Sequence, residues 1–165
     1  RSPRRLKFQG RKCFVPLARS GCVSTVDRRP GERLCAGKCD PDVNGATPVD
    51  MKTGHPQVVA KYSTHANGED VNSTNICPAA LGSKDQQPAA YSPRTGLFYV
   101  PTNHVCINFE PESGGEYVAG QPYVNAVPII FPAGRVSPGP EFANNADKHN
   151  LGNFLTCDAD KGKIV

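Results

Sequence analysis

Short apolar runs separated by turn-forming residues make up most of the chain and limit the folds that it can adopt. The runs alternate with polar residues or are continuous over a few positions, and they seldom repeat at the spacing of an α-helix. They are CFVPLA, CVSTV, PQVVAKYS, LFYVP, HVCINF, EYVAG and YVNAVPIIF. Glycine and proline each occur 16 times in the 165 residues, mostly between these runs. The pattern predicts a mostly-β protein with many short strands.

A weak internal repeat has the form of a β-hairpin. In four places an apolar or extended run is followed by Asp or Ser, three further residues, a Gly and another extended run. These turns are residues 27–31, 50–54, 92–96 and 158–162. The Asp or Ser side chain can accept hydrogen bonds from backbone amides of the turn, and glycine adopts positive φ without strain. Recurrent hairpins of this kind indicate stacked or radially arranged sheets, as in a β-propeller.

Charge is distributed unevenly along the chain. Residues 1–40 carry eleven Lys or Arg and three Asp or Glu (+8), and the remainder carries eight and twelve (−4), which together give the net charge of +4. A basic region can bind nucleic acid or an acidic partner. No aromatic interleaving or zinc-finger spacing accompanies these charges, so we interpret the region as a solvated terminus and expect no nucleic-acid partner. No apolar stretch reaches eighteen residues, so no membrane span is predicted.

Residues 110–150 differ from the rest of the chain. They are rich in proline and glycine and contain little that looks like regular structure beyond the run YVNAVPIIF. We therefore expect a long surface excursion, with disorder near residues 135–145.

No local motif forms a catalytic or metal-binding constellation. The histidines are scattered and lack the paired spacing of a metal site; they are His55, His65, His104 and His149. Four cysteines in the first forty residues fit no zinc pattern and have no histidine nearby. They are Cys13, Cys22, Cys35 and Cys39.

Two further cysteines, Cys77 and Cys106, enclose a polar run and the strand-like segment LFYV. Neither belongs to a Cys-x-x-Cys pair, which disfavours zinc. A disulfide between them would close a loop of about thirty residues and stabilise the fold by roughly 3–4 kcal/mol in the chain-entropy model. Spacing and composition leave open both a disulfide and two unrelated buried thiols.

Longer stretches of the sequence resemble a known family. The segment ICPAALGSKDQQPAAYSPRTGLFYVPTNHVC, with VDMKTGHPQVVAKYS before it and INFEP and YVAGQPYVNA after it, resembles the large subunit of methanol dehydrogenases that depend on pyrroloquinoline quinone (PQQ). It is most similar to the lanthanide-dependent type. The C-terminal GNFLTCDADKGKIV resembles a blade-closing motif of that family. The resemblance implies that residues 13–165 are a partial β-propeller domain, preceded by a basic segment, residues 1–12, that matches poorly.

The fold implied is an all-β fragment of about three blades from an eight-bladed quinoprotein alcohol dehydrogenase propeller with PQQ on its axis. Cys77 and Cys106 match two cysteines that form a disulfide in the family. Arg19, in ARSG, matches an arginine that hydrogen-bonds the quinone oxygens of PQQ, and Asp85, in SKDQQ, falls where the family places a polar side chain against PQQ. The family's catalytic aspartate and metal ligands lie upstream of the matched region, so no catalytic or metal-binding residue is assigned here.

The resemblance implies part of an enzyme that oxidises methanol, or another short primary alcohol, to the aldehyde and passes electrons to cytochrome c in the bacterial periplasm. The cofactors would be PQQ and a lanthanide or Ca²⁺, whose ligands lie outside this chain. The full-length parent would be a homodimer or hetero-oligomer. The alternatives are a PQQ-dependent ethanol dehydrogenase, another quinoprotein dehydrogenase, or a non-catalytic propeller scaffold. The 165 residues alone are expected to be inactive.

Overall fold

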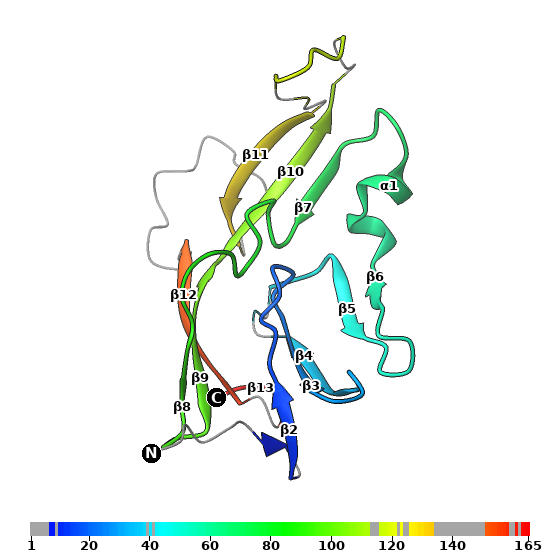
Figure 1. Ribbon diagram of the computed structural model, residues 1–165. Coiled ribbons are helices and arrows are strands. Elements are labelled where there is room, and N and C mark those ends of the chain that lie inside the picture. The colour runs from blue at the N-terminus through cyan, green and yellow to red at the C-terminus, as the bar shows by residue number, and fades with distance from the viewer. Residues whose placement is uncertain are drawn as a thin grey trace.

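The computed structural model describes residues 7–8, 10–38, 40, 42–112, 116–121, 123, 126–133, 151–158, 161 and 163–165, and Figure 1 shows how they are arranged. The segment near residues 135–145, where disorder was expected, lies outside them, as do residues 1–6 of the basic segment. Within these limits, no helix is long and apolar enough to cross a membrane.

Strands make up nearly all of the regular structure in the described residues, so the predicted all-β fold class is confirmed. The strands are β1 (Lys7–Phe8), β2 (Arg11–Phe14), β3 (Cys22–Asp27), β4 (Arg33–Lys38), β5 (Ala46–Val49), β6 (Pro56–Val58), β7 (Ser73–Ile76), β8 (Ala90–Ser92), β9 (Leu97–Asn103), β10 (Val105–Pro111), β11 (Ala126–Pro132), β12 (Gly152–Asp158) and β13 (Lys163–Ile164). The helices are single turns, η1 (Ala60–Tyr62) and α1 (Thr64–Asn67).

Two of the sheets have four antiparallel strands each. One has the order β1-β2-β3-β4, and the other has the order β13-β12-β9-β8. In the first sheet every strand pairs with the strand next to it in the chain, which is the up-and-down arrangement of a propeller blade. The second sheet has the same arrangement except that β10 and β11 intervene in the chain between β9 and β12. In Figure 1 the β9–β12 pair lies beside the sheet that contains β3 and β4.

The expected excursion after residue 110 begins inside a strand. β10 and β11 come between β9 and β12 in the chain, and they form a separate three-stranded sheet of order β11-β10-β7. Strand β11 coincides with most of the run YVNAVPIIF that was singled out as regular. Figure 1 shows this sheet extending away from the two four-stranded sheets, while β5 and β6 form a small two-stranded sheet.

A buried apolar cluster joins the two four-stranded sheets. Val23 of β3 packs with Val100 of β9 and Cys157 of β12, and none of the three is more than 1% exposed. Partly buried residues around them are Val15, Leu17, Phe98 and Leu155. Because burying an aliphatic side chain of this size contributes about 1.5–3 kcal/mol, this cluster holds β3 against β9 and β12.

The repeated hairpin motif forms the turns that were predicted. The amide of Arg29 donates to Oδ1 of Asp27 at 3.0 Å, and the amide of Lys52 donates to Oδ1 of Asp50 at 2.7 Å. The Lys52 amide lowers the pKa of Asp50 below its ordinary value, since it stabilises the carboxylate form. The glycines that end three of the turns have positive φ: Gly31 (74°), Gly54 (77°) and Gly96 (74°).

The other two turns use the same chemistry. The amide of Thr95 donates to Oγ of Ser92 at 3.4 Å, and the amide of Gly96 donates to the carbonyl of Ser92 at 2.8 Å, which closes the turn between β8 and β9. The amide of Lys161 donates to Oδ1 of Asp158 at 3.2 Å, between β12 and β13. Gly162, the expected glycine of this last turn, lies outside the described residues.

Candidate functional site

Arg19 lies in a tight turn, residues 18–21, immediately before β3. The amide of Ala18 donates to the carbonyl of Cys22 at 3.0 Å, and the amide of Gly21 donates to the carbonyl of Ala18 at 3.1 Å. Gly21 adopts a φ of 74°, which lets the chain reverse at this point. The backbone of the turn is therefore fixed, while the Arg19 side chain remains 61% exposed.

The loop that leads to Asp85 packs directly against this turn. The amide of Ser83 donates to the carbonyl of Arg19 at 2.8 Å. Gly82 also has a φ of 74°, and a Cβ at this position would lie 2.8 Å from the carbonyl oxygen of Arg19. A Cβ on Gly21 would lie 2.9 Å from Oγ of Ser83. The two segments can approach this closely because both positions are glycine.

Arg19 and Asp85 face each other across this contact. Nε of Arg19 is 3.8 Å from Oδ1 of Asp85, and Nη2 of Arg19 donates to the carbonyl of Ala80 at 2.8 Å. The Asp85 side chain is 38% exposed. An ion pair this exposed contributes at most about 1 kcal/mol, so its main consequence is to orient two charged groups at the surface.

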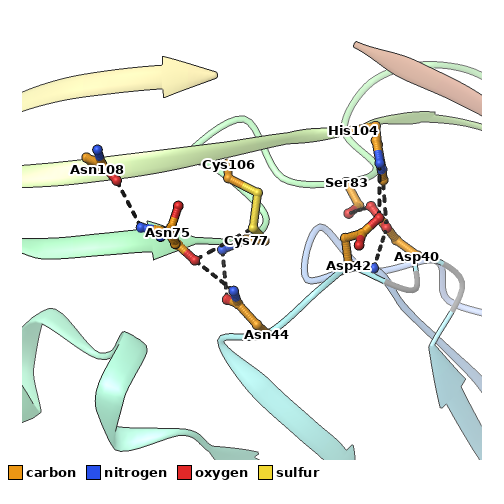
Figure 2. The surroundings of a disulfide bond; sticks show 9 residues. All are labelled: Asp40, Asp42, Asn44, Asn75, Cys77, Ser83, His104, Cys106 and Asn108. Atoms are coloured by element: carbon orange, nitrogen blue, oxygen red, sulfur yellow. Dashed lines mark hydrogen bonds and ion pairs between the residues drawn. A yellow bond between two sulfur atoms is a disulfide. The ribbon is translucent and has the colours of Figure 1, made fainter. Parts of the chain in front are cut away.

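Cys77 and Cys106 form a disulfide, which confirms what the family resemblance implied and what spacing alone left open. The two Cα atoms are 4.4 Å apart, and the bond joins the residue after β7 to strand β10 (Figure 2). Both cysteines are buried in a cluster with Phe131 and Ala133. The bond closes the base of the loop that contains Asp85.

Asparagine side chains hold the backbone next to the disulfide (Figure 2). Oδ1 of Asn44 accepts from the amide of Cys77 at 2.9 Å, and Nδ2 of Asn44 donates to the carbonyl of Asn75 at 2.7 Å. On the other side, Oδ1 of Asn108 accepts from the amide of Asn75 at 2.9 Å. Asn75 has a φ of 55°, a conformation that asparagine tolerates better than most residues. These contacts fix the chain as it enters Cys77.

A buried carboxylate links the Asp85 loop to the connection between β4 and β5. Oγ of Ser83 donates to Oδ2 of Asp40 at 2.8 Å, and the amide of Asp42 donates to Oδ1 of Asp40 at 3.1 Å. His104 lies between the two carboxylates: its Nδ1 is 3.4 Å from Asp40 and its Nε2 is 3.0 Å from Asp42 (Figure 2). The Asp40 side chain is only 4% exposed, so these contacts replace its lost hydration.

Asp40, Asp42 and His104 also have the side-chain types of a metal site. The ligand atoms of Asp40, Asp42 and His104 all lie within 4.8 Å of one another. Within the protein these groups already have polar partners: the two ring nitrogens of His104 face different carboxylates, and Asp40 also accepts from Oγ of Ser83 and from the amide of Asp42. We interpret the cluster as hydrogen bonds and ion pairs that hold the loop in place.

Sequence reasoning identified part of this region and missed part of it. The structure brings together Arg19 and Asp85, the two predicted cofactor ligands, with Nε of Arg19 3.8 Å from Oδ1 of Asp85. It also brings together Asp40, Ser83 and His104. The sequence showed His104 only as one of four scattered histidines and did not single out the other two. The three residues converge from separate connections, so no local motif could have found them; only information on contacts between distant positions would have done so.

The groups at the Arg19–Asp85 contact suit an anionic quinone. An exposed guanidinium can donate in fork geometry to carboxylate or carbonyl oxygens, and the carbonyl of Ala80 holds the Arg19 side chain in position. The carboxylate of Asp85 can accept from an N–H group. PQQ carries carboxylates, quinone oxygens and a pyrrole N–H, so these residues fit the cofactor that the resemblance implies.

Comparison with known proteins identifies relatives of the chain, although no family model matches it. It is 53% identical over 165 residues to the lanthanide-dependent methanol dehydrogenase of Methylorubrum extorquens AM1, covering 96% of this chain and 26% of the relative. It is 36% identical over 124 residues to methanol dehydrogenase (cytochrome c) subunit 1 of the same organism, and this alignment covers 75% of this chain and 19% of the relative. A solved structure of a europium-containing methanol dehydrogenase aligns with a TM-score of 0.78 and 36% identity, and the alignment covers 97% of this chain and 26% of that protein. The chain thus spans about a quarter of the length of the first of these relatives and of the solved structure.

Proposed function

We propose, from the finding that the chain belongs to the lanthanide-dependent methanol dehydrogenases, that it forms part of an enzyme that oxidises methanol or another short primary alcohol to the aldehyde. The chain spans about a quarter of the length of these relatives. Its blade-like sheets are part of a quinoprotein alcohol dehydrogenase β-propeller. The observation that carries the proposal is the contact between Arg19 and Asp85, which places a donor fork beside a carboxylate at the surface.

Arg19 and Asp85 would bind PQQ. Bound PQQ supplies a two-electron acceptor for the hydride of the alcohol carbon. The positively charged Arg19, held by the carbonyl of Ala80, would bind oxygens of the cofactor and stabilise negative charge on them. Asp85 would keep the guanidinium in orientation and accept a hydrogen bond. The chemistry of these two side chains therefore supports a role in binding and electrostatic stabilisation rather than in proton transfer.

The metal and the catalytic base would come from other parts of the complete enzyme. The relatives' names favour a lanthanide over Ca²⁺ as the metal. Asp40, Asp42 and His104 bind one another and Ser83, so we assign them no metal. The described residues contribute the cofactor contact and its support.

We further propose a periplasmic enzyme that passes electrons to cytochrome c and works as a homodimer or hetero-oligomer. One relative carries cytochrome c in its name, which supports this electron acceptor. The disulfide between Cys77 and Cys106 is consistent with an oxidising compartment.

A chimera tests this function. In it, the chain replaces the matching quarter of the Methylorubrum extorquens lanthanide-dependent relative. With PQQ and a lanthanide, the chimera should reduce an artificial electron acceptor when methanol is added. A folded chimera that holds both cofactors but oxidises no primary alcohol would disprove the proposal. A folded chimera that binds no PQQ would favour a scaffold, and a higher kcat/KM for ethanol than for methanol would favour an ethanol dehydrogenase.

A further inference from the structure

We propose that Asn103 is a positioning residue for the contact between Arg19 and Asp85; this inference rests on the proposed function. Asn103 is the last residue of β9, and the family resemblance assigned it no role. It does not touch either charged side chain in any contact described above. It acts instead on the backbone of the loop that lies between them.

Asn103 binds this loop at three points. Its amide donates to the carbonyl of Ser83 at 2.7 Å, and its Nδ2 donates to the carbonyl of Gly82 at 3.1 Å. Its Oδ1 accepts from Nε2 of Gln87 at 2.8 Å. Both polar atoms of the side chain are used, so the orientation of the Asn103 side-chain amide is determined.

Gln87 extends this chain of hydrogen bonds to Asp85. Its Oε1 accepts from the amide of Asp85 at 2.8 Å, while its Nε2 donates to Asn103. Because the oxygen and the nitrogen of Gln87 each meet a group of the opposite kind, its side chain is held in one orientation. Two consecutive hydrogen bonds therefore tie the backbone of Asp85 to the end of β9.

The other two contacts of Asn103 support Arg19. The side chain of Asn103 donates to the carbonyl of Gly82 and its backbone amide donates to the carbonyl of Ser83. Gly82 and Ser83 form the surface on which the Arg19 turn rests. The amide of Ser83 donates to the carbonyl of Arg19 at 2.8 Å. One side chain thus supports the backbone on both sides of the ion pair.

Hydrogen bonds must set the position of residues 81–87 because this part of the loop has no buried apolar side chain. Leu81, at its start, is 48% exposed, and residues 84–87 are the polar sequence KDQQ. A polar segment without buried apolar side chains is held mainly by its hydrogen bonds, and it opens locally when they are removed. Removing the two side-chain hydrogen bonds of Asn103 should therefore move Asp85 relative to Arg19 without unfolding the sheets.

The test compares Asn103→Ala, Gln87→Ala and the double variant in the chimera. Asn67→Ala is the matched control, because Nδ2 of Asn67 also donates to a backbone carbonyl, that of Lys61 at 3.2 Å. The readouts are hydrogen exchange of the amides of residues 82–87 without cofactor, and the dissociation constant for PQQ. Asn103→Ala should speed the exchange of these amides and weaken PQQ binding roughly tenfold, as expected for the loss of one or two hydrogen bonds. The double variant should weaken PQQ binding by less than the product of the single effects, since both residues act in one chain.

The exchange rates test whether Asn103 positions the loop, and the dissociation constant tests whether that position affects PQQ binding. Unchanged exchange in Asn103→Ala, or the same acceleration in Asn67→Ala, would overturn the positioning role whether or not the chimera binds PQQ. Faster exchange with an unchanged PQQ dissociation constant would overturn the link to the cofactor. If the unsubstituted chimera fails to bind PQQ, the proposed function fails, and the exchange data then still show whether Asn103 holds the loop.

Discussion

A Cβ on Gly82 would lie 2.8 Å from the carbonyl oxygen of Arg19, so the loop and the turn that carry the two predicted cofactor ligands meet at a distance that only glycine permits. This close approach explains why Arg19 and Asp85 face each other although they belong to distant parts of the chain. It also makes the position of both side chains depend on the backbone beneath them.

Gly82→Ala should destabilise the chimera more than Gly96→Ala does. The two glycines have the same φ of 74°, but a Cβ on Gly96 would meet nothing within 4 Å. Adopting positive φ costs alanine about 1–2 kcal/mol at either site, and the overlap at Gly82 should add about 1–3 kcal/mol. Denaturant unfolding of the two variants measures the difference. Equal losses would show that the approach to Arg19 is not tight.

Replacing both Cys77 and Cys106 by alanine should lower the free energy of unfolding by roughly 3–4 kcal/mol, because the disulfide restricts the unfolded chain. Cys13→Ala is the control, since Cys13 is a buried cysteine without a disulfide. Urea unfolding under oxidising conditions gives both values. If Cys13→Ala costs as much as the double replacement, packing rather than the covalent bond accounts for the stability.

Asp40→Asn should destabilise the protein far more than Asp42→Asn. The Asp40 side chain is 4% exposed and the Asp42 side chain is 44% exposed, although both contact His104. A hydrogen bond to a charged group contributes about 1.5–3 kcal/mol, and the buried Asp40 carboxylate accepts two, from Ser83 and from the Asp42 amide, whereas an exposed contact contributes at most about 1 kcal/mol. Thermal and denaturant unfolding should show this order. The reverse order would argue against Asp40 as the support of the Ser83 loop.

The isolated 165 residues should show no alcohol oxidation with PQQ and a lanthanide. The chain spans about a quarter of its relatives, and the proposed catalytic base and metal ligands are not assigned within it. Dye reduction by the purified chain, with the chimera as positive control, measures this. Turnover by the chain alone would mean that the complete chemistry lies within these residues.

The turns and the strand content could be predicted because they depend on neighbouring residues. Asp27 accepts from the amide two residues later, and Gly31 has the positive φ that the motif requires. The spacing of Cys77 and Cys106 was compatible with a disulfide but could not distinguish it from two thiols. That pairing depends on the approach of β7 to β10, which is a tertiary contact.

The support of the candidate site could not be predicted for the same reason. Asp40, Ser83 and Asn103 come from three separate connections or strand ends, and each is an ordinary polar residue in its local sequence. Their roles follow from hydrogen bonds that form only after the sheets have packed. Arg19 and Asp85 were predicted as cofactor ligands only because their surroundings resemble a known family.

The most direct test of the central claim is the dissociation constant for PQQ in the Arg19→Gln chimera, measured beside Arg94→Gln as a matched change at another exposed arginine. Loss of charge-assisted hydrogen bonds predicts binding that is weaker by roughly one to two orders of magnitude for Arg19→Gln. Arg94→Gln should bind as the unsubstituted chimera does. If both variants bind PQQ with unchanged affinity, Arg19 is not a cofactor ligand, and the account of this site is wrong.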